Sequence, residues 1–272
     1  MLDSSGPSAV PVLPSSPGLA APAFAEAEPR ALCTDCGLSR TGMAGKCGMA
    51  CQFLQPDYAA MERQVHGRAR AAEGDEAFFG PLRAMHRARL RPPAPGAQWT
   101  GITTRLAQKL LEDGKVDAVL TVGPDPDDRW RPRPILVTDP AMMAQARGMR
   151  MGYAPLLALL EPAAAAGHRR LAVVGIPCQV HALRRLEAEL GLERLYVIGT
   201  PCSDNTTTEN FHKFLGLLTD APDTVSYLEF RADYHVEMRF DDGRTREIPF
   251  LKLPLSDLPD DFFPLTCRTC VD

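Results

Sequence analysis

The sequence contains no uninterrupted apolar run of about 18 residues, the length at which a membrane-spanning helix is expected. It also lacks HExxH, GxSxG and Walker patterns, so nothing supports a zinc protease, a hydrolase of the nucleophile-elbow type or an NTPase. Positive charge is not in excess, because 30 Lys and Arg stand against 34 Asp and Glu, for a net charge of -4. The composition therefore favours a protein that has no transmembrane segment and binds no nucleic acid.

Residues 1–30 lack the features of a secretory signal. The segment is rich in Pro, Ala and Ser, prolines break its apolar runs, and its only basic residue is Arg30. A signal peptide needs a positively charged start and an unbroken apolar stretch. We therefore expect residues 1–30 to be a disordered leader and the protein to be cytoplasmic.

The chain has eight cysteines. Disulfide frameworks belong to oxidising compartments, which proteins reach through a secretory signal. Without that signal the cysteines favour metal or redox chemistry, and a disulfide framework stays a minor alternative.

Three segments follow the leader. Residues 31–62 hold four cysteines but few large apolar side chains, so a bound metal centre would have to supply the missing stability. Residues 63–97 have a mixed helical pattern and predict a linker. Residues 98–272 change character and predict an α/β domain.

Within this domain, strand and helix patterns alternate. Short apolar runs at 116–123, 133–138, 171–178 and 195–202 predict strands, and the intervening helices include 100–116, 179–190 and 205–218. The alternation indicates βαβ units and an α/β fold with a mostly parallel sheet and flanking helices.

The C-terminal part has a different pattern. Residues on both sides of Asp241-Asp242-Gly243 alternate in polarity, which predicts an antiparallel hairpin. The chain then stops two residues after a CxxC pair, with no closing helix or strand. We expect it to be a piece of a longer protein.

The first cysteine set is Cys33-x2-Cys36-x10-Cys47-x3-Cys51. A CxxC pair presents two thiolates to one metal centre, and the second pair completes a set of four ligands. Spacing alone leaves structural zinc and an iron–sulfur cluster about equally favoured.

The second set is spread over the α/β domain. Cys178 and Cys202 each follow a predicted strand and a Gly-x-Pro turn, and Cys267 and Cys270 form a CxxC pair. Turns after parallel strands meet at the carboxyl edge of the sheet, where ligands gather. Cys178 and Cys202 could instead be buried as small apolar residues, but the repeated turn favours a second four-cysteine site.

Two polar helix starts are candidate sites for a phosphate-bearing cofactor. One contains Thr100, Gly101, Thr103 and Thr104, and the other contains Asn205 and Thr206. Amides and hydroxyls at a helix start can bind a phosphate, although the same residues also serve as ordinary caps.

The stretches CTDCGLS, GAQWTGITT, GIPCQVHALR, YVIGTPCSDNTT and PLTCRTCVD occur in this order. With them the chain resembles the beta-subunit family of coenzyme F420 (deazaflavin) hydrogenases and dehydrogenases, from about Cys33 to the end. Within that family it is similar to the branches that act on chlorophyll precursors.

The resemblance implies FAD and two 4Fe-4S clusters, with reduced ferredoxin as the electron donor. It implies reduction of the 8-vinyl group of divinyl protochlorophyllide or chlorophyllide, with reduction of 7-hydroxymethyl chlorophyll a, or another flavin-linked reduction, as the alternative. It also implies a cytoplasmic setting or one peripheral to photosynthetic membranes. A zinc-stabilised binding protein without redox activity is the alternative from another class.

One position departs from the family pattern. Related sequences have CxxCGLC where this chain has Ser39, so Cys47 is the expected replacement ligand in the first set.

Overall fold

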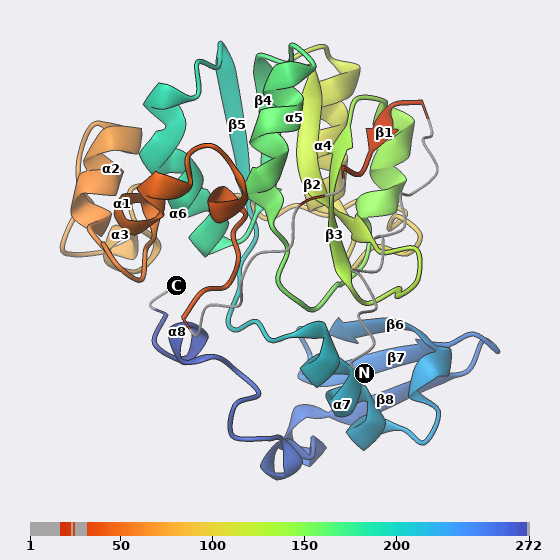
Figure 1. Cartoon of the computed structure of the whole chain (residues 1–272). Helices are drawn as coiled ribbons and strands as arrows, with labels where there is room; N and C mark the ends of the chain where they lie inside the picture. Colours follow the sequence, from red (N-terminus) through yellow and green to blue (C-terminus); the bar gives the residue numbers. More distant parts are fainter. Residues whose placement is uncertain (1–16, 23, 25–31, 271–272) are drawn as a thin grey trace, which may run out of the picture.

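The computed structural model describes residues 17–22, 24 and 32–270. Figure 1 shows two lobes, a larger one around a five-stranded sheet and a smaller one around a three-stranded sheet. In the described part of the chain, no helix combines the length and the apolar character needed to cross a bilayer. Most of the predicted leader lies outside the described residues.

The larger sheet has the strand order β1-β3-β2-β4-β5. β2, β4 and β5 run parallel, whereas β3 is antiparallel to both of its neighbours, β1 and β2. The strands are β1 (Leu19–Ala20), β2 (Ala118–Pro124), β3 (Pro132–Val137), β4 (Arg170–Gly175) and β5 (Arg194–Gly199).

The prediction of a mostly parallel sheet was wrong, because the sheet is mixed. The strand pattern at 133–138 is correct, but only residues 125–131 join β2 to β3, and they contain no helix. A parallel pair needs a crossover of a dozen or more residues, so β3 folds back antiparallel to β2.

β1 is a second correction, because we predicted a disordered leader there. Leu19 and Ala20 pair with Val137 and Leu136 at the edge of the sheet. The N–H of Thr138 also donates to the carbonyl of Gly18 at 2.8 Å. The open edge of β3 thus pairs with this short segment through backbone hydrogen bonds. The Pro-, Ala- and Ser-rich composition of residues 1–30 gave no sign of this pairing.

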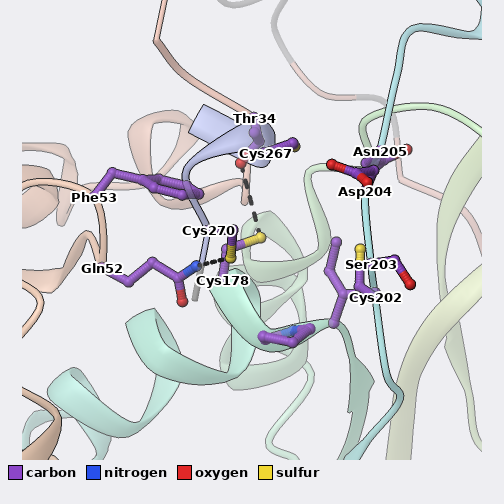
Figure 2. Close-up of a pocket in the computed structure, with 12 residues that line it drawn as sticks. Thr34, Gln52, Phe53, Cys178, Cys202, Ser203, Asp204, Asn205, Cys267 and Cys270 are labelled. Carbon is purple, nitrogen blue, oxygen red and sulfur yellow. Dashed lines mark hydrogen bonds between the residues drawn. The ribbon is translucent and has the colours of Figure 1, made fainter. Parts of the chain in front are cut away.

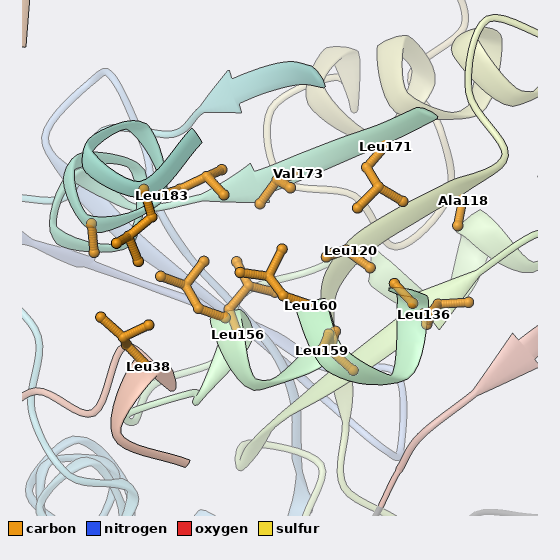
Figure 3. Packing of buried hydrophobic residues seen from close by; sticks show 14 of the residues in the cluster. Leu38, Ala118, Leu120, Leu136, Leu156, Leu159, Leu160, Leu171, Val173 and Leu183 are labelled. Carbon is orange, nitrogen blue, oxygen red and sulfur yellow. The ribbon is translucent and has the colours of Figure 1, made fainter. Parts of the chain in front are cut away.

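Helices cover both faces of this sheet. On one face, α4 (Ile102–Glu112) and the 3-10 segment Pro140–Ala146 pack on alternate strand residues such as Val119 and Ala172. On the other face, α5 (Leu160–Ala165) and α6 (Pro177–Leu186) pack on the residues between them, as Figure 3 shows for Leu120, Leu171 and Val173. The predicted alternation of strands and helices therefore gives a three-layer core.

The N-terminal cysteine segment lies beside α6. It forms α1 (Cys47–Ala50) and the start of α2 (Tyr58–His66), and α3 (Asp75–Phe79) follows within the predicted linker (Figure 1). Nδ1 of His181 lies 3.0 Å from the carbonyl oxygen of Ala50, and Leu38 is buried in the core of the larger lobe. From residue 80 to residue 101 the chain has no helix or strand, so the predicted helical linker is helical only near its start.

The smaller lobe contains α7 (Thr208–Leu218) and the antiparallel strands β6 (Val225–Phe230), β7 (His235–Phe240) and β8 (Thr245–Pro249). β7 and β8 form the predicted hairpin, and β6 extends it to a three-stranded sheet. Trp130 from the loop between β2 and β3 packs on Phe211 of α7, with ring centroids 5.2 Å apart. A buried aromatic contact therefore joins the two lobes.

Candidate functional site

Cys178 and Cys202 occupy equivalent places at the carboxyl edge of two parallel strands. β4 ends at Gly175, and Cys178 is the second residue of α6. β5 ends at Gly199, and Cys202 follows it by three residues. Because β4 and β5 are parallel neighbours, both Gly-x-Pro-Cys turns leave the sheet at the same edge.

Cys267 and Cys270 reach the same place from the C-terminal segment. Cys267 lies in α8 (Leu265–Arg268), and the N–H of Cys270 donates to the Cys267 carbonyl at 3.0 Å. Figure 2 shows all four cysteines around one pocket, whose volume is about 20 Å³. The structure therefore brings the whole second set together.

Two thiols of this pocket, those of Cys178 and Cys267, are shielded from solvent. Burial raises the pKa of Cys178 to about 12, although the Thr34 hydroxyl acts in the opposite direction. Burial also raises the pKa of Cys267. Because a metal centre binds thiolates, its binding must displace protons from these side chains at neutral pH.

Two side chains of the N-terminal segment contact sulfur atoms of the second set. Nε2 of Gln52 donates to Sγ of Cys270 at 3.3 Å, and Oγ1 of Thr34 lies 3.8 Å from Sγ of Cys178 (Figure 2). Gln52 is buried, and its Oε1 has no hydrogen-bond partner among the described residues. The N-terminal segment thus forms one wall of the C-terminal cysteine pocket.

Two cysteines of the first set, Cys33 and Cys47, lie within electrostatic reach of the mostly buried thiol of Cys36. Burial raises the pKa of Cys36 to about 12, and charge on Cys178, Cys33 or Cys47 would raise it further. Cys47 begins α1, and Cys51 directly follows that helix and donates its N–H to the Cys47 carbonyl. Cys36 therefore lies within electrostatic reach of both sets.

The donor sets consist of cysteine thiols, which iron–sulfur clusters and structural zinc both take as ligands. No disulfide joins the eight cysteines, all of which lie in the described part of the chain. Four thiolates on one Zn²⁺ at about 2.3 Å would lie within about 4 Å of one another. No three Cys, His, Asp or Glu side chains of the described residues are placed to hold a single ion in this way.

A wider hollow opens beside the cysteine pocket. Its volume is about 630 Å³, which lies in the range of small-molecule sites. Pro177, Cys202 and Ser203 line both spaces. The remaining lining residues come from the N-terminal half and the β5 turn: Tyr58, Arg70, Phe78, Phe79 and Pro201.

Two adjacent phenylalanines give this hollow its apolar character. Phe78 and Phe79 of α3 are 84% and 68% exposed, which is unusual for such large apolar side chains. An exposed aromatic pair that lines a hollow indicates a ligand or partner surface. The sequence offered one signal, the Phe-Phe-Gly tripeptide in a stretch with few other aromatics, and we did not predict a site there. Gln52 carried no signal beyond its position next to Cys51.

The first predicted phosphate site lies elsewhere. Thr100, Gly101, Thr103 and Thr104 stand at the start of α4, and none of them lines either of the two spaces. Gly101 has φ +88°, and Oγ1 of Thr100 accepts a hydrogen bond from the Leu90 N–H at 3.1 Å. This helix start therefore anchors the preceding irregular segment, and its role in cofactor binding stays a prediction.

The second predicted phosphate site is divided. Asn205 lines the cysteine pocket, and its Nδ2 donates to the Gly152 carbonyl at 3.0 Å. Thr206 is fully buried, and its hydroxyl donates to the Phe262 carbonyl. Asn205 is thus near the thiols, whereas Thr206 ties the C-terminal segment to the start of α7.

Two family models match the chain. Residues 85–161 match the N-terminal model of the coenzyme F420 hydrogenase/dehydrogenase beta subunit, and residues 168–272 match its C-terminal model. The matched ranges include α4, α6, α7 and α8 and all four cysteines of the second set.

Relatives and a solved structure agree with these matches. The chain is 42% identical over 243 residues to 7-hydroxymethyl chlorophyll a reductase, chloroplastic, of Oryza sativa subsp. japonica, with 88% of this chain and 51% of that protein covered. It is 37% identical to an uncharacterized protein of Nostoc sp. (strain PCC 7120), with 89% and 61% covered. The chain thus spans about half to three fifths of these relatives.

One structural neighbour is a chain of the F420-reducing [NiFe] hydrogenase complex from Methanosarcina barkeri. The TM-score is 0.56 at 20% identity, with 65% of this chain and 61% of that chain covered. At this identity the likeness concerns the fold.

Proposed function

The chain belongs to the coenzyme F420 hydrogenase/dehydrogenase beta-subunit family, and from this premise we propose that it is the iron–sulfur part of a reductase that acts on a chlorophyll-type tetrapyrrole. One observation carries the proposal: a pocket lined by four cysteines opens beside an aromatic hollow of about 630 Å³. The thiols that would hold an electron carrier therefore lie next to a space that could bind a planar ligand. The relative that is named a chlorophyll reductase supports the choice of substrate class.

Two 4Fe-4S clusters and FAD would supply one-electron transfer and hydride chemistry when bound. We assign one cluster to Cys33, Cys36, Cys47 and Cys51, and the other to Cys178, Cys202, Cys267 and Cys270. The electrostatic proximity of Cys36 and Cys178 supports electron flow between the two sets. Reduced ferredoxin is the proposed donor, and the cytoplasm or the surface of photosynthetic membranes the proposed setting.

The hollow has side chains suited to a planar tetrapyrrole. The rings of Tyr58, Phe78 and Phe79 can stack on an extended π system and exclude water from it. Arg70 contributes positive charge at the rim, where its Nε also binds Glu62. Chlorophyllides carry a carboxylate, so a cation beside an aromatic wall matches both parts of such a ligand.

Two reactions suit this site. Reduction of the 8-vinyl group of divinyl protochlorophyllide adds two electrons and two protons across the carbon–carbon double bond and gives an ethyl group. Reduction of a 7-hydroxymethyl group adds two electrons and two protons and releases water, which leaves a methyl group. We propose the 8-vinyl reaction, and the 42% identity to a 7-hydroxymethyl chlorophyll a reductase favours the second as the alternative.

Anaerobic turnover tests the proposal. The full-length protein, with reduced ferredoxin, is offered divinyl protochlorophyllide and 7-hydroxymethyl chlorophyll a in separate reactions. Mass spectrometry distinguishes the products, because the first substrate gains two hydrogens and the second loses an oxygen. Turnover of neither substrate by brown, cluster-loaded protein would refute the tetrapyrrole assignment. A colourless protein containing zinc would refute the redox function and favour a zinc-stabilised binding protein.

A further inference from the structure

A segment of concentrated positive charge follows the aromatic hollow. From Ala77 to Leu111 the sequence has no Asp or Glu. Residues 83–91, which we call the basic segment, are extended on the surface without helix or strand. They carry Arg83, Arg87, Arg89 and Arg91, together with His86.

The charges of the basic segment are not neutralised within the described structure. All four arginines are exposed. Nearby arginines are paired, as in the contacts of Arg68 with Glu76 and of Arg70 with Glu62. No described carboxylate lies within 4.0 Å of the four arginines of the basic segment, whereas many of the other described arginines form such pairs.

The basic segment is also close to the proposed electron acceptor. It begins four residues after Phe79, so Arg83 lies at most about 14 Å from Phe79 along the chain. Phe79 lines the hollow that Cys202 also lines. At its other end the segment is fixed by the hydrogen bond from the Leu90 N–H to Oγ1 of Thr100. Met85, 60% exposed, adds an apolar contact among the charges.

We propose that the basic segment is the docking surface for an acidic electron-carrier protein. The inference rests on the proposed function, which supplies the cluster that receives the electron. The chain as a whole is acidic, with net charge -4, so it repels an acidic partner except where positive charge is concentrated. A local patch of opposite sign therefore sets the orientation of the encounter and raises its rate, and it places the partner beside Phe79 and Cys202.

Matched charge reversals test the proposal. One variant combines Arg83→Glu with Arg87→Glu, and the control combines Arg169→Glu with Arg194→Glu. Arg169 and Arg194 are also exposed, but they stand at the amino ends of β4 and β5, opposite to the cysteine edge. Both variants change net charge by the same amount. The probe is a plant-type [2Fe-2S] ferredoxin, whose binding to the full chain is measured by calorimetry at several salt concentrations.

We expect Arg83→Glu with Arg87→Glu to weaken ferredoxin binding at low salt by about tenfold or more and to flatten its salt dependence. The control should bind almost as the unmodified protein does. Dithionite, which needs no docking surface, should reduce all three proteins at equal rates. Equal weakening in both variants, or none in either, would overturn the proposal, as would tighter binding of a DNA duplex than of ferredoxin. Binding by calorimetry does not require a cluster, so failure of the proposed function is recognised separately by the missing iron–sulfur absorption.

Discussion

Hydrogen bonds to ligand sulfur are the means by which single residues control an iron–sulfur centre. An N–H donor withdraws charge from a thiolate and makes the attached cluster easier to reduce. Gln52 is such a donor, because its Nε2 contacts Sγ of Cys270 and its side chain is 3% exposed. The Oε1 atom of Gln52 has no hydrogen-bond partner among the described residues. Because an unpaired buried oxygen costs stability, the Gln52 amide is not explained by stability alone.

We therefore expect Gln52→Leu to shift the midpoint potential of the second cluster to a more negative value. Stability should change little, because the substitution also removes the unsatisfied Oε1. The control is Gln64→Leu, since Gln64 donates to the Arg184 carbonyl and not to sulfur. A redox titration followed by electron paramagnetic resonance measures the shift. An unchanged midpoint potential in Gln52→Leu would show that Gln52 does not set the potential of the second cluster.

A second question at the residue scale is whether Ser39 or Cys47 is a ligand in the first cysteine set. Cys47 lies within electrostatic reach of Cys36, and it begins α1 in the same segment. We expect Cys47→Ala to lose about half of the bound iron, because its thiolate is a ligand of one of the two proposed four-iron clusters. Ser39→Ala should retain all of it. Iron analysis of both purified variants decides, and loss of iron from Ser39→Ala would make the hydroxyl a ligand.

Secondary-structure elements hold the ligands at fixed positions, and glycine allows the closest contact between them. Gly37 directly follows Cys36, has φ +102°, and packs on the 3-10 turn Leu156–Leu159. A Cβ at Gly37 would lie 2.5 Å from the Pro155 carbonyl oxygen and 2.6 Å from the Ala158 nitrogen. These are backbone atoms, which cannot rotate away as a flexible side chain does.

Gly37→Ala should accordingly displace the first CxxC turn and cost about 1–3 kcal/mol of stability. We expect loss of iron from the first site with the second retained. Gly45→Ala is the matched control, because the same addition at Gly45 meets no atom within 4 Å. Thermal unfolding and iron content measure the two effects. Full iron in a stable Gly37→Ala protein would show that the turn can shift freely.

The amino ends of β2 and β4 are joined by a carboxylate. Asp117 accepts hydrogen bonds from the backbone N–H groups of Arg169 and Arg170 and from the Arg170 guanidinium. The hydrogen bond from the Arg170 side chain, with the two backbone bonds, holds the pKa of Asp117 below its usual value. A carboxylate with a lowered native pKa adds stability at pH values above about 4, and this stability is lost as pH falls through the native pKa.

Asp117→Asn should therefore lower the free energy of unfolding at pH 7 by about 1–2 kcal/mol. The difference from the unmodified protein should shrink steadily as the pH is lowered below about 4. The control is Asp113→Asn, which removes a surface ion pair with Lys109. It should lower the free energy of unfolding by only about 0.3–0.5 kcal/mol, as is typical of such a pair. Urea unfolding across this pH range provides the measurement. A deficit for Asp117→Asn that persists unchanged at low pH would refute the electrostatic origin.

Elements were easier to predict than their connections. Apolar runs marked β2 to β5 because buried strands are rich in such residues, and the repeated Gly-x-Pro-Cys turn indicated that Cys178 and Cys202 share one edge. The direction of β3 depends on a loop length that we did not weigh, and β1 depends on backbone pairing at an open edge. The contact of Gln52 with Cys270 joins residues far apart in sequence, and no local pattern encodes it.

For the whole molecule, the cysteine pocket is where three distant parts of the chain meet. The carboxyl edge of the larger lobe supplies Cys178 and Cys202, the C-terminal segment supplies Cys267 and Cys270, and the N-terminal segment supplies the wall at Thr34 and Gln52. Among the described residues, the C-terminal segment makes few hydrogen bonds to the rest of the protein, one of them between the Asn205 backbone and the Cys267 thiol. The carbonyl of Phe262 accepts hydrogen bonds from Thr206 and Asn210, and Gln52 contacts Cys270. A bound cluster would therefore supply much of the attachment of residues 264–270.

This arrangement predicts different responses to loss of the two metal centres. Cys202→Ala should release residues 264–270 and expose the backbone at Arg268, which we expect trypsin to cleave about tenfold faster or more. Cys33→Ala should lose the other cluster but leave cleavage at Arg268 nearly unchanged, because Cys33 belongs to the first set. Timed digestion under anaerobic conditions with mass spectrometry of the fragments distinguishes the two variants. Equal cleavage rates in both would mean that protein contacts alone hold the C-terminal segment, and that the proposed cluster does not join the parts of the molecule.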